Sequence, residues 1–480
     1  MSEIPRQSRF DSKDVVVMKF GGTSVEDVAA IRRLISIVQS KRGVQPVLVV
    51  SALAKVTDQL LESGNAAANG HLGAALARVR DIYVRHEHLA DALVGQEHYA
   101  ALDRELRACF RALESLLLQL EATGQLDLRY QDQLLSFGEC LSSRLIKEAL
   151  SEAGVNATHV DSRASIVTDR KHGQASPLWE VTNDRLQQTL GPILEAGSVP
   201  VMGGFIAATE EGVPTTLGRG GSDFTASIVG AALGAARVEI WTDVDGVMTT
   251  DPKLCPDARV IRKMGFEEAA ELAHFGAKVL HPATLAPAMR ENIPVYVLNS
   301  RRPAAEGTEI VAHAHTGKRV SAITAKRNVA AVDVTLSRNL DSELLGEVFA
   351  AFDQHSCHVE VLATGLSRLS LIVGSTASLP KIAAQLKPLA ELKWENHKAL
   401  VCLIGEDIRR QPEVAGRVFQ TVSDMDVRVL CQSASDRTIS FLVEEPKVQE
   451  AVQRLHRVFF PKPELSRDWG GISTAYCQAG

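Results

Sequence analysis

Short apolar runs separated by long helical stretches recur through the first 300 residues of the chain, and this alternation constrains the fold more than any other feature. The runs carry hydrophobic residues at consecutive positions, so both faces of each expected strand must be covered. Strands of that kind, joined by helices, are typical of a largely parallel sheet with helices on both sides. We therefore predict an α/β domain with strands at residues 15–20, 47–50, 155–160, 199–206, 237–244 and 294–299.

The first expected strand ends in a pair of glycines, and a helix is expected soon afterwards. Ser24 and Asp27 form an S-x-x-D capping signal, and the hydrophobic residues that follow recur at helical spacing as far as Gly43. Glycine is a typical residue just after the end of a helix. The segment therefore predicts a strand, a tight glycine turn and a helix in immediate succession.

The carboxyl ends of four expected strands carry small, glycine-rich and polar sequences. These are KFGGTS, VVSALAKVTD, VMGGF and WTDVDG. In open parallel sheets, ligands bind outside the carboxyl ends of the strands. We therefore expect the four ends to face a single ligand-binding crevice.

Two glycine turns, at residues 20–24 and 218–223, each precede an expected helix. The chain has neither the P-loop consensus nor the dinucleotide consensus. Backbone N–H groups at helix N-termini bind phosphate oxygens, and glycine allows a close approach. Either turn alone is more often a tight loop than a phosphate site, but the pair, with Lys19 beside the first, favours a phosphate site. Lys19 is then either an edge charge that reaches solvent or a cation for a transferring phosphoryl group.

Charged residues near the second glycine turn suggest a site for an amino acid. Arg219 has the planar guanidinium that pairs with a carboxylate through two parallel hydrogen bonds. Glu139 lies among apolar residues, where a buried carboxylate needs a partner such as a ligand ammonium group. Asp223 is a first-turn aspartate favoured by the helix dipole, a position compatible with a catalytic role. Lys278, judged from its spacing alone, is an ordinary helix lysine.

The C-terminal part of the chain contains an internal repeat. Residues 346–373 and 416–443 align without a gap at an offset of 70, and each copy contains a helix followed by two strands. A strand before each copy and a helix after it complete two small ferredoxin-like units. The expected organisation is a flexible tail at 1–13, an α/β domain at 14–305, a linker at 306–325, and two ferredoxin-like domains at 326–397 and 398–480.

Charge and cysteine content argue against several classes of function. The formal net charge is −6 with no basic stripe, so we expect no nucleic-acid partner. The seven cysteines include no C-x-x-C pair, which argues against a disulfide framework and a zinc site. No apolar run approaches the length of a membrane span, and the N-terminus has no signal-like apolar segment. We therefore expect a cytoplasmic protein without a membrane partner.

Seven ordered motifs resemble those of the aspartokinases, which have the amino acid kinase fold. The C-terminal repeat resembles the paired ACT regulatory domains of that family. The resemblance extends from about Val15 to the end of the chain and is strongest to the monofunctional, lysine-sensitive class. It implies a mostly parallel sheet sandwiched by helices, followed by two ferredoxin-like βαββαβ ACT domains. The motifs are KFGGTSV (19–25), VVSALAKVTD (49–58), SFGECLSSRL (136–145), GGFIA (203–207), TTLGRGGSDFTA (215–226), WTDVDGVMTTDP (241–252) and FGAKVLHPAT (275–284).

The resemblance also implies a reaction, in which ATP phosphorylates the β-carboxylate of L-aspartate to give 4-phospho-L-aspartate. Lys19 and Asp223 would be catalytic, Arg219 would hold the α-carboxylate and Glu139 the α-amino group. Mg²⁺ would arrive with the nucleotide, and no protein residue is assigned as a metal ligand. The implied substrate-binding residues are Ser51, Thr57, Glu139, Phe205, Arg219, Gly220, Gly221, Ser222, Asp223 and Thr225. The implied ATP-binding residues are Lys19, Gly21, Gly22, Thr242, Asp243, Met248, Lys253 and Lys278.

The chain departs from the family pattern at three places. Met248 stands where relatives often have tyrosine, and Lys253 stands where they often have arginine. Both positions bear on contacts with the nucleotide. In the first ACT unit, Glu343 and Leu344 stand near the position of a glycine in the longer effector loop of lysine-inhibited relatives. Weak or absent inhibition by lysine is therefore expected.

The resemblance leaves regulation and pathway open. The product would supply the synthesis of lysine, threonine and methionine or, in a dedicated enzyme, of ectoine. The ACT pair would bind a small amino-acid effector and associate across chains into a homodimer or a dimer of dimers. Two alternatives are another acyl-phosphate-forming kinase, such as one acting on glutamate, and an amino-acid sensor that has lost catalysis. Glu139 and the ACT pair argue against the first, and Lys19 with Asp223 against the second.

Overall fold

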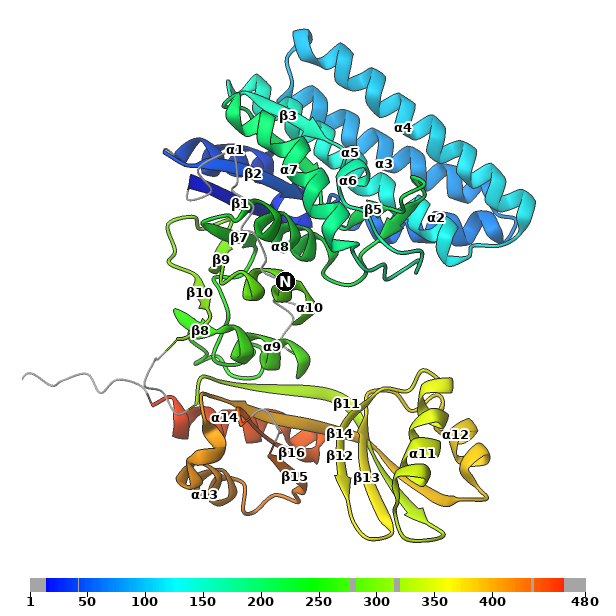
Figure 1. Ribbon diagram of the computed structural model, residues 1–480, viewed down its shortest axis with the longest axis vertical. Helices are drawn as coiled ribbons and strands as arrows, with labels where there is room; N and C mark the ends of the chain where they lie inside the picture. The colour runs from blue at the N-terminus through cyan, green and yellow to red at the C-terminus, as the bar shows by residue number, and fades with distance from the viewer. Residues whose placement is uncertain (1–13, 42, 277–281, 315–319, 433–435, 462–480) are drawn as a thin grey trace, which may run out of the picture.

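The protein consists of two bodies, as the computed structural model shows (Figure 1). The structure describes every residue except 1–13, 42, 277–281, 315–319, 433–435 and 462–480. The larger body is built from the described chain before residue 315, and the smaller one from the described chain after residue 319. The expected tail at 1–13 and Lys278 lie outside the described residues.

The larger body is organised around a mostly parallel sheet. Its strands are β1 (Val15–Phe20), β2 (Gln45–Val50), β3 (Ala157–Val160), β4 (Val199–Gly203), β7 (Arg237–Thr242), β8 (Lys263–Gly265), β9 (Val295–Asn299) and β10 (Thr308–Val311). Among the described residues their order is β3-β4-β2-β1-β7-β9-β10-β8, and β9 with β10 is the antiparallel pair. A separate hairpin consists of β5 (Ile206–Ala208) and β6 (Pro214–Thr216). The predicted α/β class is confirmed.

The alternation of side chains along β1 decides which helix its lysine meets. All six residues of the strand are buried. Val15 and Val17 pack in one hydrophobic core, and the alternate residues Val16, Met18 and Phe20 pack in another. Because successive side chains of a strand point to opposite faces, Lys19 lies on the face of Val17. Helix α8 (Gly221–Leu233) covers that face and contributes Val229 to the same core.

Helices cover both faces of this sheet, as strands with no polar face require. One core is completed by α1 (Val28–Ser40), α2 (Val56–Ala68), α3 (Leu72–Leu93), α4 (Gln96–Thr123) and α5 (Leu128–Glu152). The other is completed by α7 (Trp179–Glu195), α8, α9 (Phe266–His274) and α10 (Pro282–Arg290), and the short α6 spans Ser162–Ser165. None of the helices in the described ranges combines the length and the apolar character that crossing a bilayer requires.

The start of α1 differs from the capping signal predicted for it. The N-cap is Asp27, whose carboxylate accepts a hydrogen bond from the backbone of Ala30 at 2.7 Å. Ser24 lies in a 3-10 turn, η2 (Gly22–Ser24), and its hydroxyl donates to the hydroxyl of Ser300 at 2.8 Å. The prediction is therefore correct for Asp27, which caps the helix, and wrong for Ser24, whose hydroxyl bonds to Ser300 instead.

The smaller body is an antiparallel sheet with two pairs of helices. Its strands are β11 (Ala322–Leu336), β12 (Val359–Thr364), β13 (Arg368–Val373), β14 (Ala390–Ile404), β15 (Arg428–Gln432) and β16 (Thr438–Glu444). In the described chain their order is β12-β13-β11-β14-β16-β15. The helices are α11 (Ser342–Gln354), α12 (Leu379–Leu386), α13 (Pro412–Thr421) and α14 (Val448–Phe459), with 3-10 turns η3 (Ile408–Arg410) and η4 (Glu445–Lys447).

Two long strands run through both halves of the smaller body. The later part of β11 packs in the core with α11 and α12, whereas its first residues, such as Ile323, pack in the core with α13 and α14. A register shift between Lys326 and Val329 separates these two parts. The second ferredoxin-like unit therefore takes an outer strand from a segment that precedes the first unit in sequence.

The predicted linker at 306–325 is therefore wrong for its described part. Strand β10 pairs with β9 and β8 in the larger sheet, and Ala322 to Ala325 pair with Ile404 to Val401 of β14. The polar, small-residue composition of this stretch suggested a boundary. Backbone pairing nevertheless incorporates it, because a strand can bury its backbone without a long apolar run.

The first residues of β11 also join the two bodies. The N–H of Ile323 donates to the carbonyl of Thr249 at 2.7 Å, and the hydroxyl of Ser321 donates to Glu268 at 2.5 Å. The hydroxyl of Thr249 lies 2.9 Å from Nε2 of His456 in α14, in a buried hydrogen bond. Residues around Thr249 are thus held directly by the smaller body.

Candidate active site

A cavity of about 380 Å³ opens at the carboxyl ends of β1, β2 and β4. Parallel strands bring these three ends to one edge of the sheet, as the sequence pattern predicts. The first turns of α2 and α8 and the middle of α5 complete the walls. The lining residues are Lys19, Gly22, Ser51, Ala52, Leu53, Ala54, Lys55, Thr57, Asp58, Glu139, Phe205, Gly218, Gly220, Gly221, Ser222 and Asp223.

An ion pair between Lys19 and Asp223 lies in this cavity. The lysine Nζ is 2.7 Å from Oδ1 of Asp223, and both side chains are largely buried. No partner of Oδ1 other than this lysine is found among the described residues, so the lysine is its compensating charge. The strand supplies the cation and the first turn of α8 supplies the anion. The pair therefore holds an ammonium group in position within a partly desolvated space.

Glycines keep the surroundings of this ammonium group open. A Cβ added at Gly21 would lie 3.5 Å from Lys19 Nζ, and one added at Gly22 would lie 3.0 Å from the carbonyl oxygen of Ala52. The N-cap of helix α8 is Gly220, which has a left-handed φ of 72° and provides no side-chain cap. An uncapped helix N-terminus beside a lysine is well suited to bind an anion.

Glu139 has a buried carboxyl group, one oxygen of which lacks a hydrogen-bond partner among the described residues. It lies in the middle of α5 with 3% of its surface exposed, and its Oε2 has no hydrogen-bond partner among the described residues. Burial raises the pKa of Glu139 to about 8, against the lowering effects of backbone hydrogen bonds and of the Lys19 charge. A cationic group bound in the cavity would supply the missing partner.

Phe205 lines the cavity, and Thr225 supports it from behind. Phe205 adopts a left-handed φ of 64°, and its N–H donates to the hydroxyl of Thr225 at 3.0 Å. That hydroxyl donates in turn to the carbonyl of Gly221 at 2.9 Å. Thr225 is fully buried and does not line the cavity. In this structure it holds Phe205 against the start of α8 instead of facing a ligand.

Arg219 lies elsewhere than expected. Its side chain is exposed and lines a neighbouring cavity of about 250 Å³ together with Trp179 and Phe224. The flanking residues Gly218 and Gly220 both line the first cavity. The neighbours of the arginine therefore line the first cavity, while the arginine itself lines the neighbouring one. The other expected substrate residues, Ser51, Thr57, Glu139, Phe205, Gly220, Gly221, Ser222 and Asp223, do lie together around the first cavity.

A second cavity, of about 490 Å³, lies beyond the carboxyl end of β7. Asp243, Met248 and Lys253 line it, as expected for one site, and Thr242 stands beside them with its hydroxyl 3.3 Å from Asp243 Oδ1. Gly21 lines neither cavity. Its N–H donates to the carbonyl of Trp241 at 3.1 Å, which places the turn after β1 next to the end of β7. The two cavities thus lie at neighbouring strand ends.

Several lining residues were missed by the sequence analysis. Lys55 and Asp58 line the first cavity, and their position in the quoted VVSALAKVTD motif was the available signal. Asp245 and Arg302 line the second cavity and form an ion pair. The segment Ile323–Ala325 lines it too, although it belongs to the sheet of the smaller body, and no local sequence pattern indicates that contact.

Comparison with known proteins identifies the family. The sequence pattern of the Amino acid kinase family matches residues 14–299, and that of the ACT domain matches residues 401–459. The chain is 35% identical to the lysine-sensitive aspartokinase 3 of Escherichia coli over 93% of this chain and 99% of that protein. It belongs to the aspartokinases, within the amino acid kinase family.

Solved structures of an aspartokinase agree with this family. A crystal structure of E. coli aspartokinase III in complex with aspartate and ADP, in the R-state, matches with a TM-score of 0.82 at 33% identity, covering 93% of this chain and 100% of that one. The same enzyme in complex with lysine and aspartate, in the T-state, matches with a TM-score of 0.78 at 33% identity and the same coverage. The chain therefore shares its overall fold, over nearly its whole length, with this aspartokinase.

The Glu139 pKa predicts a pH-dependent cost to stability. Between pH 4.5 and about 8 the folded chain retains a proton that the unfolded chain has lost, so this group lowers the free energy of unfolding as the pH rises. Glu139→Gln should raise the free energy of unfolding by roughly 4 to 5 kcal/mol at pH 8.5 and by much less at pH 5. Thermal and urea unfolding at both pH values measure this. Glu121→Gln, at an exposed position of α4, is the control, and an equal gain at both pH values would contradict the prediction.

Proposed function

We propose that the chain is an aspartate kinase, which transfers the γ-phosphoryl group of ATP to the β-carboxylate of L-aspartate. The products are 4-phospho-L-aspartate and ADP. The observation that carries the proposal is that the Lys19–Asp223 ion pair lies in the same cavity as Glu139, whose Oε2 has no hydrogen-bond partner among the described residues. One group suits a transferring phosphoryl group and the other suits the amino group of an amino acid. The related enzyme that binds aspartate and ADP supports the same pair of ligands.

The acceptor needs positioning more than activation. A β-carboxylate is already an anion, so its oxygen attacks the γ-phosphorus without a general base, and the bond from that phosphorus to the ADP oxygen breaks. Lys19 stabilises the negative charge that spreads over the phosphoryl oxygens, and Asp223 holds Lys19 in place. Glu139 binds the α-amino group, and Ser51, Thr57, Phe205 and the start of α8 surround the remaining atoms. Thr225 contributes indirectly by fixing Phe205.

The second cavity is the proposed ATP site. Thr242, Asp243, Met248 and Lys253 surround the nucleotide there, Gly21 and Gly22 let its phosphates reach Lys19, and Lys278 is assigned to this site by the family resemblance alone. The described residues contain no group of three or more His, Cys, Asp or Glu side chains that could hold a metal ion. The carboxylates of Asp243 and Asp251 in the cavity nevertheless fit a hydrated Mg²⁺ that is carried mainly by phosphates. The metal would neutralise phosphate charge during transfer.

Arg219 is proposed to bind the substrate α-carboxylate after its side chain moves. The backbone on both sides of it lines the first cavity, and the guanidinium is exposed, with no ion pair found for it in the described structure. A long side chain can therefore turn from the neighbouring cavity toward a bound anion at little cost in lost contacts. Its planar fork would then match the carboxylate geometry.

The ACT region is proposed to carry regulation and assembly. Its described sheet ends in the edge strands β12 and β15, and sheets of this kind associate through such edges. Pairing across chains would give a homodimer or a dimer of dimers and a place for an amino-acid effector. The product would supply lysine, threonine and methionine synthesis or a dedicated ectoine pathway. The cysteines found free include buried ones such as Cys140, which suits the reducing cytoplasm.

Lys19→Ala should lower the turnover number about 10³-fold, because the transition state loses its main cation. The assay incubates the chain with ATP, magnesium, L-aspartate and hydroxylamine, which converts the acyl phosphate to aspartyl hydroxamate. Lys147→Ala, a substitution on α5 outside both cavities, is the control. Product with glutamate but none with aspartate would overturn the substrate, and full turnover by Lys19→Ala would overturn the mechanism.

Arg219→Ala should raise the KM for aspartate by about 10-fold or more while the KM for ATP changes little, because a bidentate contact to the substrate carboxylate is lost. Steady-state kinetics with each substrate varied in turn measure this. Arg170→Ala removes an exposed arginine that pairs with Glu211, and should leave both constants unchanged. An unaltered aspartate KM in Arg219→Ala would show that the guanidinium stays in its neighbouring cavity.

Lysine at millimolar concentration should inhibit the chain less than about fivefold, below the usual range of allosteric coupling. Helix α11 begins at Ser342 with Asp341 as its N-cap, so Glu343 and Leu344 lie in the first helical turn and leave a short connection to β11. Titration of the kinase activity with lysine, threonine and methionine tests this. Half-maximal inhibition at submillimolar lysine is the result that would refute it.

A further inference from the structure

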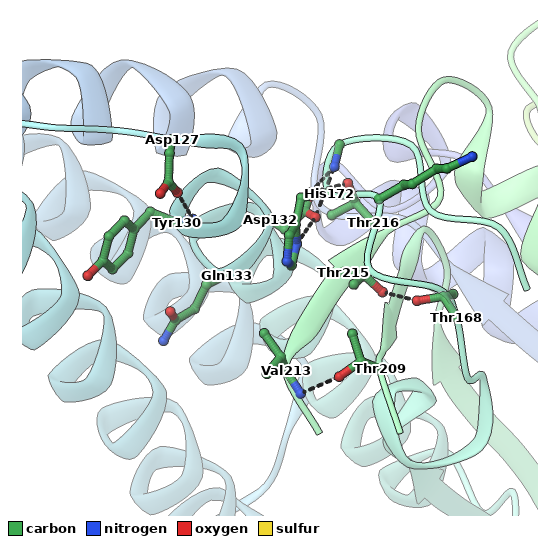
Figure 2. Close-up of polar contacts among 12 residues, drawn as sticks. Asp127, Tyr130, Asp132, Gln133, Thr168, His172, Thr209, Val213, Thr215 and Thr216 are labelled. Carbon is green, nitrogen blue, oxygen red and sulfur yellow. Dashed lines mark hydrogen bonds and ion pairs between the residues drawn. The ribbon is translucent and has the colours of Figure 1, made fainter. Parts of the chain in front are cut away.

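Asp132 lies outside both cavities and is a buried carboxylate whose two oxygens both have polar partners. It lies near the start of α5 with its side chain 1% exposed. It accepts a hydrogen bond from the hydroxyl of Thr216 at 2.5 Å and from the N–H of Gly173 at 3.0 and 3.1 Å. Nδ1 of His172 lies 2.9 Å from its other oxygen. Figure 2 shows the carboxylate between His172 and Thr216.

The groups bound by Asp132 come from two segments that lie next to the proposed substrate site. Thr216 is the last residue of β6, and the cavity-lining Gly218 follows it by two residues. Gly218 has a left-handed φ of 74°, and a Cβ added there would lie 3.3 Å from the carbonyl oxygen of Gly173. The N–H of Ala175 donates to the carbonyl of Thr216 at 2.9 Å. One carboxylate therefore holds both the start of the glycine-rich segment and the loop on which that segment rests.

Helix α5 connects Asp132 to the other side of the cavity. Glu139 follows Asp132 by seven residues, which is two helical turns, so the two side chains lie on one face of the helix. Glu139 lines the cavity, whereas Asp132 does not. The distance between the proposed amino-binding group and the glycine-rich segment is thus set by a rigid helix at one end and by the Asp132 contacts at the other.

The neighbouring β5–β6 hairpin has its own contacts, which do not depend on Asp132. The hydroxyl of Thr215 lies 2.6 Å from that of Thr168, and the N–H of Val213 donates to Thr209 at 3.3 Å (Figure 2). The N–H of Leu217 donates to the carbonyl of Phe205 at 2.9 Å. Loss of the Asp132 contacts would therefore free the segment that follows the hairpin and leave the hairpin paired.

We propose that Asp132, through Thr216 and the backbone of Gly173, is a positioning residue for the amino-acid acceptor. It fixes the position of the segment from Gly218 to Asp223 relative to Glu139. It thereby sets the distance between the parts of the site that bind the ammonium and the carboxylate groups of the acceptor. This inference rests on the proposed function of the site and deepens it. Asp132 is not among the residues that line the proposed nucleotide cavity.

The test compares variants of the full-length chain by the KM for aspartate and the KM for ATP. Asp132→Asn should raise the aspartate KM about 10-fold or more, because one oxygen acceptor and the charge are lost. Thr216→Val should raise it about 3- to 10-fold, and Thr216→Ser, which restores the hydroxyl, should return it to within about twofold of wild type. The KM for ATP should stay within about twofold throughout.

Thr215→Val is the matched control, since Thr215 is an equally buried threonine of the same strand whose hydroxyl bonds to Thr168 instead of Asp132. It should lower the unfolding temperature as Thr216→Val does and leave the aspartate KM unchanged. Equal rises in both KM values, or the same selective rise in Thr215→Val, would overturn the proposal. The Thr216 variants decide the question even if Asp132→Asn does not fold.

The outcomes separate this inference from the proposed function. A wild-type chain that phosphorylates another amino acid would refute the aspartate assignment, and the same variants measured with that acceptor would still decide the role of Asp132. A wild-type chain that phosphorylates no amino acid would refute both the proposed function and the proposed role of Asp132.

Discussion

A lysine buried at the end of a parallel strand must be compensated, and the rest of this site is arranged around the way Asp223 compensates Lys19 at 2.7 Å. The ion pair requires that β1 lie in the middle of the sheet and that α8 begin over its carboxyl end. It also requires a start to α8 that leaves space for a ligand, which Gly220 provides by its left-handed backbone. Strand order, helix placement and glycine content are therefore parts of one electrostatic arrangement.

Close packing around small residues gives the cavity its shape. A Cβ at Gly204 would lie 2.6 Å from Cβ of Ser222, and one at Gly221 would lie 2.6 Å from the ring of Phe205. These contacts press the end of β4 against the first turn of α8, and any larger side chain would separate them. Glu139 enters the same space from α5, where Gly203 allows it to approach. Its raised pKa of about 8 is the electrostatic consequence of its burial in that tight enclosure.

The two bodies share a wall at the second cavity. Residues Ile323–Ala325 line it, and they belong to the long strand β11 that continues into the sheet of the smaller body. Thr249, beside the same cavity, is bound both to Ile323 and to His456 of α14. Residues of the smaller body therefore form part of the wall of the proposed nucleotide site.

Sequence alone determined the α/β class, the internal repeat and many of the residues that line the first cavity. Apolar periodicity and glycine-rich strand ends are local patterns, so they can be recognised in the sequence itself. Lys19, Glu139 and Asp223 could be selected because charges at such positions need partners. Only the tertiary structure decided that Arg219 faces a neighbouring cavity, that Thr225 holds Phe205, and that the expected linker is part of two sheets. Asp132 could not be found in this way either, since its partners are about 40 and 84 positions away in the chain. Contacts of that kind depend on how helices and loops meet in space, and no local pattern records them.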